Sequence, residues 1–297
     1  MTKKPPALAW ILFLVLSIIW GSSFILIKKG LTFLGPEEVA ALRIASASLV
    51  LLPFAAGRIK QINKKNITSL ILVGFMGSLL PAFFFAVAQT RLTSALTGIM
   101  NALTPFFTII ISVLFFREKP EKRVYIGVML GFLGTLFLIS TRENGQFSFN
   151  YYAFFVVAAT VLYGINANLI KHYLNLMKSL SIASLSLTMV GPLAVIYLLF
   201  LTPFLDHIHE PEVLIASGYI VILGVFGTAL ALILFNKMVQ LTNAVFSTSV
   251  TYLIPIISVF WGYIDGEQLS LLQLVSMLTI MIGIFISNSK KVIKKPG

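Results

Sequence analysis

Ten apolar runs, each about as long as a membrane-crossing helix, make up most of this chain. A helix needs roughly 20 apolar residues to cross the hydrocarbon layer of a bilayer, where every backbone polar group must be satisfied internally. The chain has 297 residues, of which 58% are hydrophobic and 11% charged, too little polar surface for a soluble globule of this size. We therefore predict an all-α integral membrane protein with ten transmembrane helices at residues 7–27, 36–56, 68–88, 94–116, 124–140, 151–170, 180–201, 213–235, 244–264 and 269–288.

The two halves of the chain resemble each other. Residues 20–28 read aromatic, glycine, four variable residues and Leu-Ile-Lys, and the same pattern returns at 163–171. The motif Leu103-Thr104-Pro105 returns as Leu253-Ile254-Pro255. Glu118 follows the first copy, and Glu267 follows the second at a similar distance. Self-similarity of this kind indicates a duplicated chain. We expect the first five-helix repeat at residues 1–143 and the second at residues 144–297.

The charges of the loops predict how the helices are oriented. Cytoplasmic loops of membrane proteins carry an excess of Lys and Arg. Basic residues cluster in the segments 58–65 and 117–123 and near both ends of the chain. The loops assigned to the opposite side hold only Lys28, Lys29, Arg91 and Arg142. Both termini are therefore predicted to be cytoplasmic.

The same charges predict that the second repeat is inverted relative to the first. Each predicted repeat has an odd number of helices, so the second one starts from the opposite side of the membrane. Its segments 202–212 and 265–267 correspond to the two basic loops of the first repeat, and they contain no Lys or Arg. Inverted repeats place a central site between two similar bundles that can rock against each other, which is a transporter architecture.

Several classes of function are disfavoured by composition. A formal net charge of +12 is compatible with nucleic-acid binding, but the basic residues lie at the ends of apolar runs, which membrane orientation explains better. The absence of cysteine excludes disulfides, cysteine zinc sites and thiol nucleophiles. His207 and His209, flanked by Asp206 and Glu210, suit either a metal ion or, more simply, a solvated loop. We expect no catalytic residues, no metal, no cofactor and no nucleic-acid partner.

Short motifs in both halves of the chain carry a family resemblance. They are Trp20-Gly21-Ser22-Ser23, Ala41-Leu42-Arg43, Thr93-Ser94-Ala95, Leu103-Thr104-Pro105 and Glu118 followed by Gly127, then Thr242-Asn243-Ala244, Leu253-Ile254-Pro255, Gly266-Glu267 and Gly283. Together with the ten-helix layout, they make the chain resemble the EamA-type transporters of the drug/metabolite transporter superfamily over essentially its whole length. The resemblance implies a bacterial-type exporter of amino acids or related metabolites.

Two prolines in the middle of predicted helices mark the first candidate positions. Proline removes one helical hydrogen bond and frees the carbonyl group four residues earlier. Pro105 and Pro255 would free the carbonyls of Asn101 and Thr251, which correspond to each other in the two repeats. Such groups at membrane depth either line a cavity or are satisfied by neighbouring helices.

Polar and aromatic residues in the first and sixth predicted helices are further candidates. They lie near the expected interface of the repeats, where they either bind substrate or form hydrogen bonds between helices. Asn101 and Thr251, whose carbonyls the prolines free, Tyr252 directly after Thr251, and Arg43 complete the candidates. The candidate substrate-binding set is Trp20, Ser22, Ser23, Arg43, Asn101, Tyr163, Asn166, Asn168, Thr251 and Tyr252.

Arg43 is the charged residue placed furthest inside a predicted span. No Asp or Glu stands three or four positions from it, so its partner has to come from another helix, from cavity water or from a substrate carboxylate. Ionisable residues at membrane depth are functional candidates by default. The alternative is that Arg43 snorkels or bonds a carbonyl of a neighbouring helix.

Together these features predict a secondary transporter that exports amino acids or related small metabolites from the cytoplasm across the inner membrane by alternating access. Nucleobases, drugs and other hydrophobic metabolites are alternative substrates. A multi-span enzyme acting on lipid is the alternative from another class, but it would need a cluster of His, Asp or Glu at one interface. We expect a monomer or homodimer whose partners are the bilayer and a small-molecule substrate. Because all acids and histidines lie at helix ends or in loops, we also expect passive transport.

Overall fold

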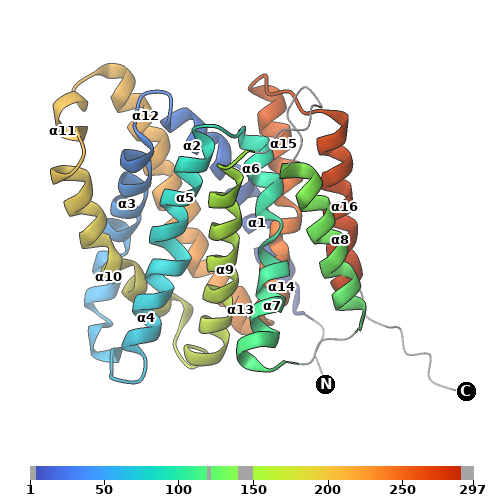
Figure 1. Cartoon of the computed structure of the whole chain (residues 1–297). Coiled ribbons are helices and arrows are strands. Elements are labelled where there is room, and N and C mark those ends of the chain that lie inside the picture. The colour runs from blue at the N-terminus through green and yellow to red at the C-terminus, as the bar shows by residue number, and fades with distance from the viewer. Residues whose placement is uncertain (1–4, 119–121, 140–149, 289–297) are drawn as a thin grey trace, which may run out of the picture.

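The computed structural model describes residues 5–118, 122–139 and 150–288, and over these ranges it contains helices and no strands (Figure 1). The first half comprises α1 (Ala7–Gly21), α2 (Ser23–Gly30), α3 (Pro36–Ala56), η1 (Ile59–Gln61), α4 (Ile67–Gly74), η2 (Phe75–Leu79), α5 (Leu80–Gln89), α6 (Ser94–Asn101), α7 (Thr104–Phe116) and α8 (Lys122–Ile139). The second half comprises α9 (Ala153–Tyr173), α10 (Ser179–Phe200), α11 (Phe204–His207), α12 (Pro211–Ile222), η3 (Leu223–Leu230), α13 (Ala231–Leu241), α14 (Ala244–Thr248), η4 (Ser249–Tyr252), α15 (Ile254–Ile264) and α16 (Leu271–Asn288).

Eight helical stretches of the described chain are long and apolar enough to cross a membrane. They are Ala7–Gly30, Pro36–Ala56, Ile67–Gln89, Ser94–Phe116, Ala153–Tyr173, Ser179–Phe200, Pro211–Leu241 and Ala244–Ile264. The fifth and tenth predicted spans correspond to α8 and α16, each of 18 residues in the described part. The all-helical membrane class is thus confirmed, whereas the number of ten spans stays a prediction.

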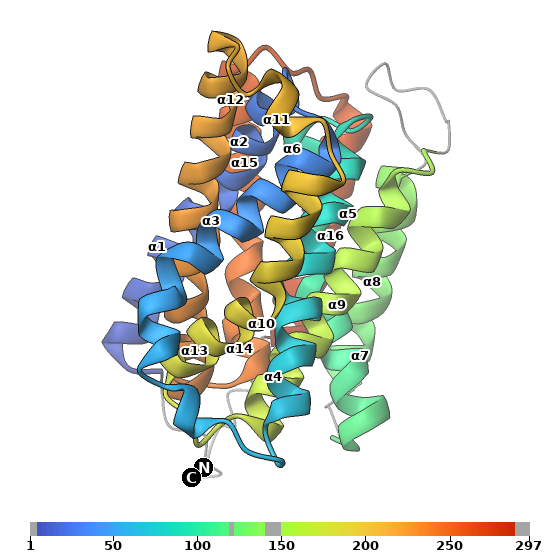
Figure 2. The ribbon, with the colours of Figure 1, turned by 90° about the vertical axis from the view of Figure 1, so that its left-hand side faces the viewer.

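The helices stand side by side, and the connections gather at the two ends of the bundle (Figures 1 and 2). The loops after α3, α9 and α13, together with the end of α7, lie at the end where α1 begins, which we call the lower end as in Figure 1. The loops after α2, α5 and α15, together with α11, lie at the upper end. Helices α1 and α9, the first of each half, run in opposite directions. Opposite directions of these two helices are what an inverted repeat requires, and the inversion itself stays a prediction.

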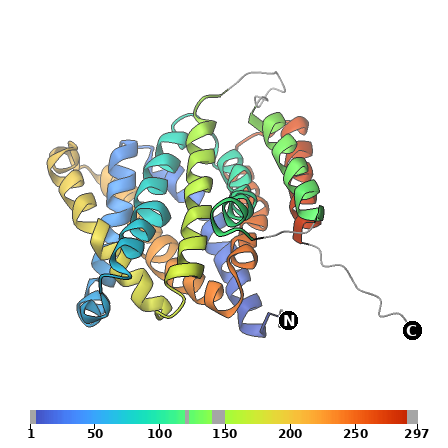
Figure 3. The ribbon, with the colours of Figure 1, turned by 60° about the horizontal axis from the view of Figure 1, so that its bottom comes forward.

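Helices α8 and α16 pack against each other at one side of the bundle, so the last helix of each half pairs with its counterpart (Figure 3). The contact is close because it uses glycines on both helices. A Cβ atom placed at Gly283 would lie 2.6 Å from the carbonyl oxygen of Gly127 and 2.7 Å from the amide nitrogen of Gly131. The boundary expected at residues 143 and 144 lies outside the described residues.

Two predicted spans contain a break at the positions expected to be kinked. The helix before Pro105 ends at Asn101, and α7 begins at Thr104. In the second half, α14 gives way to a 3₁₀ turn, η4, before α15 begins at Ile254 with Pro255 in its first turn. Proline is well tolerated there, because the first turn of a helix has no intrahelical acceptor for its amide groups. Each of these spans therefore consists of two short helices.

The third span of each half contains a π-helical turn instead. These turns are η2 in the first half and η3 in the second. One extra residue in a helical turn leaves backbone groups poorly paired and is often found at functional sites. Both turns border the cavity described below.

Close helix contacts show that the repeat is preserved in three dimensions. A Cβ atom at Gly74 would lie 2.4 Å from the carbonyl oxygen of Ser186, and one at Gly224 would lie 2.6 Å from the carbonyl oxygen of Arg43. The third helix of each half therefore makes the same close contact with the second helix of the other half. By this contact, Ser186 occupies in the second repeat the place that Arg43 has in the first.

Candidate functional site

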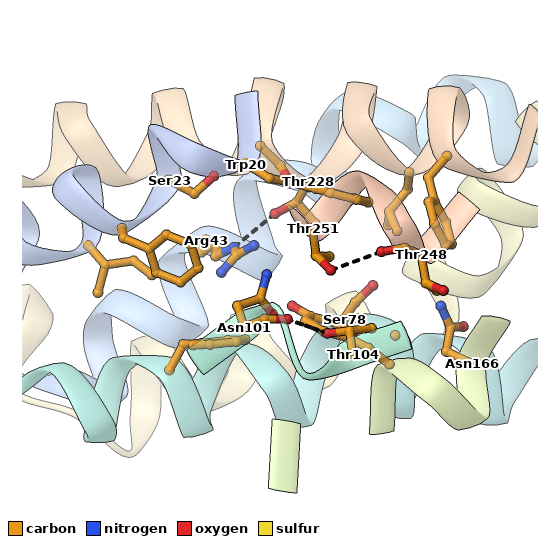
Figure 4. A pocket seen from close by; sticks show the side chains of 18 residues that line it. Trp20, Ser23, Arg43, Ser78, Asn101, Thr104, Asn166, Thr228, Thr248 and Thr251 are labelled. Atoms are coloured by element: carbon orange, nitrogen blue, oxygen red, sulfur yellow. Dashed lines mark hydrogen bonds between the residues drawn. The ribbon is translucent and has the colours of Figure 1, made fainter. Parts of the chain in front are cut away.

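A cavity with about 750 Å³ of empty space, part of it open to solvent, lies between the two halves (Figure 4). Its walls come from the first, second, third and fourth spans of the first half and from the first, third and fourth spans of the second. The lining residues are Trp20, Ser23, Phe24, Ile27, Arg43, Gly77, Ser78, Phe85, Asn101, Thr104, Tyr163, Asn166, Gly227, Thr228, Leu232, Phe235, Thr248 and Thr251.

Many of these residues are related by the internal repeat. Two pairs lie 143 residues apart, and four pairs lie 150 residues apart. They are Trp20 with Tyr163, Ser23 with Asn166, Gly77 with Gly227, Ser78 with Thr228, Phe85 with Phe235 and Asn101 with Thr251. Each repeat therefore contributes many of the same positions to the wall of this one cavity.

Arg43 on α3 is the charged residue in this lining. It is 8% exposed, and its Nε donates a hydrogen bond to Oγ1 of Thr228 at 2.9 Å. Figure 4 shows its side chain in the pocket with the end group pointing toward Thr228. The side chain of Tyr163 is also within interaction range of the guanidinium. Thr228 lies in η3, so the partner of Arg43 comes from the other half of the chain.

Aromatic rings form the apolar walls of the cavity. The rings of Trp20 and Phe235 have their centroids 5.4 Å apart, and those of Phe85 and Tyr163 stack with centroids 5.9 Å apart. The indole Nε1 of Trp20 donates to the carbonyl oxygen of Gly227 at 3.0 Å. This acceptor is a backbone group of the π-helical turn η3, which ties the position of the tryptophan to the irregular third span.

The two helix breaks place hydroxyl and amide groups in the cavity. Thr104 Oγ1 donates to the carbonyl oxygen of Asn101 at 2.8 Å, and Thr251 Oγ1 donates to that of Thr248 at 2.9 Å. The carbonyl freed before Pro105 is therefore satisfied locally by a side chain. The amide of Asn101 and the hydroxyls of Thr248 and Thr251 remain at the wall (Figure 4).

Asn166 faces the cavity at a point where α9 and the third span are in close contact. A Cβ atom at Gly77 would lie only 2.6 Å from Oδ1 of Asn166. That oxygen is buried and has no hydrogen-bond partner among the described residues. A buried, unpaired amide oxygen is costly, and such groups concentrate where function requires them.

Three of the ten predicted binding residues do not line the cavity. Ser22 accepts a hydrogen bond from Nε1 of Trp261 at 2.9 Å. Asn168 joins helices: its Oδ1 accepts from Ser112 Oγ at 2.7 Å, and its Nδ2 donates to the carbonyl oxygens of Thr108 and Gly164. Tyr252 is half-buried and packs against the apolar core. Asn168 differs from Asn166 because two residues along a helix turn a side chain by about 200°.

The other seven predicted residues line the cavity together. They are Trp20, Ser23, Arg43, Asn101, Tyr163, Asn166 and Thr251. Sequence reasoning missed Ser78, Phe85, Thr228 and Phe235, among others. The signal that could have found these four is the spacing of 150 residues that already joined Asn101 to Thr251.

Ion pairs link α2 to the α15–α16 loop at the upper end of the bundle. Lys28 contacts Glu267 at 2.8 Å and Asp265 at 2.7 Å, and Lys29 contacts Asp265 at 2.5 Å. Glu267, whose side chain is 3% exposed, also accepts from the amide nitrogens of Ser94 and Ala95, both at 2.9 Å. It therefore caps the N-terminus of α6 and joins the two halves.

The repeat-related pair lies at the lower end. Lys171 at the end of α9 forms an ion pair with Glu118, and Nε2 of His172 lies 3.4 Å from the same carboxylate. The side chain of Glu118 is 37% exposed, in contrast to Glu267. The N-terminus of α14, the counterpart of α6, is capped by its own Asn243, which accepts from the amide of Phe246 at 2.9 Å. The two ends of the molecule are thus built alike but closed differently.

At the upper end, the neighbouring groups determine the protonation state of Glu267 and Asp265. Burial by itself raises the pKa of Glu267, but hydrogen bonds from Lys28, Ala95 and Ser94 outweigh it and hold that pKa below its ordinary value. The pKa of Asp265 is also lowered, because Lys28 and Lys29 outweigh the effect of its burial. Both carboxylates are therefore charged near neutral pH.

The predicted metal candidate at the upper end contacts a carboxylate group. Nε2 of His207 lies 2.8 Å from Oε1 of Glu38, whose other oxygen accepts from the amide of Gly35 at 2.8 Å. Within the described ranges, no group of three or more His, Asp or Glu residues is arranged to hold a metal ion.

Comparison with known proteins agrees with this architecture. The model of the EamA-like transporter family matches residues 7–140 and again residues 150–289. The chain belongs to the EamA-like transporter family. The two matches show that the EamA domain occurs twice, and the membership confirms the family resemblance seen in the motifs.

Several relatives of this EamA chain carry transporter names. An uncharacterized transporter of Archaeoglobus fulgidus is 26% identical over 95% of this chain and 99% of that protein. The uncharacterized inner membrane transporter YedA of Escherichia coli K12 is 22% identical over 91% of this chain and 87% of its own length. A probable amino-acid metabolite efflux pump of Salmonella typhimurium is 26% identical over 49% of this chain and 46% of that protein.

One crystal structure has the same fold. It superposes on 94% of this chain and 96% of its own with a TM-score of 0.63, at 18% sequence identity. The EamA chain described here is thus a multi-span membrane protein of a transporter family, and its relatives are named as transporters rather than enzymes.

Proposed function

We propose that this protein is a secondary transporter that exports amino acids or related small metabolites from the cytoplasm across the cytoplasmic membrane by alternating access. The observation that carries the proposal is the cavity enclosed between two halves that line it with repeat-related residues. A site at the interface of inverted repeats can open to either side when one bundle rocks against the other. The Salmonella relative named as an efflux pump supports the direction and the substrate class.

The inverted arrangement with ten spans is part of this proposal. The opposite directions of α1 and α9 support inversion, and the pairing of α8 with α16 supports a fifth span in each half. The lower end carries the basic loop after α3, so the positive-inside rule makes that end cytoplasmic. Localisation to the inner membrane is further supported by the relative YedA.

The two ion-pair clusters supply a mechanism for alternation. At the upper end, Glu267 binds Lys28 and the N-terminus of α6, so this end is fastened. At the lower end, Glu118 binds Lys171, while α14 is capped by its own Asn243. In the opposite state, the repeat relation assigns Glu118 to the N-terminus of α14 and releases Glu267 from α6. Each carboxylate then alternates between fastening its end of the cavity and leaving it open.

Transport down the substrate's own gradient fits the placement of acids. Asp and Glu are absent from the described residues that line the cavity. Glu38, which is 3% exposed at the start of α3, is bound to His207 near the upper end. A proton-driven carrier would need a titratable group at the central site.

The test is metabolite export from cells that overproduce the protein. We expect one or a few small metabolites to accumulate outside cells with wild-type protein but not with Trp20→Ala, compared at equal abundance in the membrane. Gly218→Ala serves as the matched control, because a Cβ atom at Gly218 meets no atom within 4 Å. Equal extracellular metabolites for wild type and Trp20→Ala would contradict the proposal.

A further inference from the structure

The cavity carries an unbalanced charge. Arg43 is permanently charged, because a guanidinium keeps its proton at any physiological pH. The remaining described lining is neutral: hydroxyls, amides, aromatic rings and aliphatic groups. The ion pairs of the described chain that involve Lys28, Lys29, Lys171 and His207 lie at the two ends of the bundle. Nothing in the described lining therefore neutralises Arg43.

The guanidinium of Arg43 has two neutral neighbours, the hydroxyl of Thr228 and the side chain of Tyr163. Nε donates to the hydroxyl oxygen of Thr228 at 2.9 Å. This hydrogen bond orients the plane of the guanidinium, and it does not neutralise the charge because threonine is neutral. The two terminal nitrogens can then present a pair of parallel N–H groups, which is the geometry that a carboxylate accepts. An uncompensated charge in a membrane interior is costly, and a bound anion removes that cost.

The positive charge of Arg43 has no counterpart in the second repeat. Ser186 packs against Gly74 in the same way as Arg43 packs against Gly224, so Ser186 is the counterpart of Arg43 in the second repeat. Most of the cavity wall is present twice, whereas the positive charge is present once. A substrate with one negative charge makes the cavity neutral, a dianion leaves an excess negative charge, and an amine meets repulsion.

The rest of the wall is suited to an apolar body. Trp20 and Phe235 form one pair of rings, and Phe85 and Tyr163 form another. The ammonium group of an amino acid would find neutral oxygens and aromatic rings here but no carboxylate, next to a like charge on Arg43. The described wall thus matches the carboxylate of an amino acid better than its ammonium group.

We propose that the cavity binds a singly charged organic carboxylate with an apolar body through Arg43, and that an ammonium group is not required. This inference rests on the proposed transport function and narrows its substrate class. Amino acids are then accepted through their carboxylate, and carboxylates without an amine are accepted at least as well.

The test uses three probes with the same phenyl ring and two-carbon chain. They are 3-phenylpropanoate with a carboxylate only, phenylalanine with both groups and 2-phenylethylamine with an amine only. Each is titrated into purified protein in detergent while thermal unfolding is followed, since a ligand that binds the folded state raises the midpoint with concentration. We expect 3-phenylpropanoate to raise the midpoint at least as much as phenylalanine and the amine to have no effect.

Three variants separate binding from folding. Arg43→Gln should weaken the apparent affinity for 3-phenylpropanoate at least ten-fold, and Arg43→Lys should weaken it less, because it keeps the charge but not the paired N–H groups. Arg91→Gln, at an exposed position, should leave the titration unchanged. A monodisperse elution profile and an unfolding transition without ligand show that each variant is folded.

Several results would overturn the inference. They are binding of the amine, ten-fold tighter binding of phenylalanine than of 3-phenylpropanoate, no binding of either carboxylate, or unchanged affinity in Arg43→Gln. The proposed function is tested independently, because export from overproducing cells does not depend on these probes. Export that persists while the carboxylate titration fails would retain the transporter and reject the substrate class.

Discussion

At the scale of single residues, the same residue type has different roles that depend on the direction of its side chain. Asn101 and Asn166 line the cavity, whereas Asn168 is buried with all its polar atoms bound to α7 and α9. The amide of Asn101 has a weak internal partner, because Thr104 Oγ1 lies 3.4 Å from its Oδ1. Loss of the Asn101 amide and loss of the Asn168 amide should therefore affect different properties of the protein.

The first prediction compares Asn101→Leu with Asn168→Leu. Asn101→Leu should lower transport several-fold with little change in stability, because its amide faces the cavity. Asn168→Leu removes the acceptor of Ser112 Oγ and the second donor to the carbonyl oxygens of Thr108 and Gly164, and it should lower the free energy of unfolding by about 1 kcal/mol or more. Flux and thermal unfolding of the two variants check this. Unchanged transport in Asn101→Leu would remove that residue from the site.

The second prediction concerns the contact of Gly77 with Asn166. A methyl group at position 77 would approach Oδ1 of Asn166 to 2.6 Å, so Gly77→Ala must displace the side chain of Asn166 or separate the helices. Overpacking of this kind costs about 1 to 3 kcal/mol. We expect a lower unfolding midpoint and reduced transport, measured against Gly218→Ala, which has open space around it. A wild-type midpoint for Gly77→Ala would show that the contact is loose.

At the scale of elements, irregular helices position the site. The breaks after Asn101 and around η4 leave the fourth span of each half as two short helices. A short helix depends on its caps, because its first amide groups have no intrahelical acceptors. Helix α6 has two such caps, its own Thr93 and Glu267 from the other half. The cap from the other half links the orientation of α6 to closure of the upper end.

The third prediction tests this cap with Glu267→Gln. Glutamine keeps an acceptor for only one of the amides of Ser94 and Ala95, because they bind different oxygens of Glu267, and it loses the charge that binds Lys28 and the positive end of α6. We expect a loss on the order of 1 kcal/mol in stability and easier opening of the upper end. Glu118→Gln, at a side chain that is 37% exposed, should cost less. An equal or larger cost for Glu118→Gln would contradict the assignment of the closed end.

The pH dependence of this cap has a definite sign. The pKa of Glu267 is lowered in the folded state from its ordinary value of 4.5. Its contribution to stability is therefore complete above pH 4.5 and is lost as pH falls through the lower folded pKa. Thermal unfolding across this range should show a smaller acid-induced decrease in Glu267→Gln than in wild type. Asp265, with its lowered pKa, adds a decrease of the same sign in both proteins.

At the scale of the whole molecule, two similar halves enclose one cavity. The loop after α3 and the segment containing α11 lie at opposite ends, although they occupy corresponding places in the two repeats. If the membrane lies across the bundle, these segments face opposite compartments. The excess of basic residues after α3 assigns that loop to the cytoplasm.

The fourth prediction places single cysteines at these two segments. The chain contains no cysteine, so Lys64→Cys and Glu210→Cys each introduce a unique and exposed thiol. A membrane-impermeant maleimide added to intact cells should label position 210 but not position 64. Permeabilised cells should be labelled at both. Labelling of both positions in intact cells would reject the inverted repeat.

The sequence alone determined that this protein lies in a bilayer, that it is helical and that it contains an internal repeat. Twenty-residue apolar runs leave few alternatives in a bilayer, because no water is present to pair backbone groups. The correspondence of Trp20 with Tyr163 and of Asn101 with Thr251 could also be read from spacing, and all four residues meet in the cavity. These features depend on local composition and periodicity.

Only the tertiary structure decided which candidates share a site and what binds them. Arg43 meets Thr228 from the other half of the chain, while Asn168 turns away from Asn166 into a helix contact. The breaks at the prolines and the cap of α6 by Glu267 likewise depend on neighbours. Sequence spacing does not fix the rotation of one helix against another, and small residues allow close contacts only where the packing brings a partner.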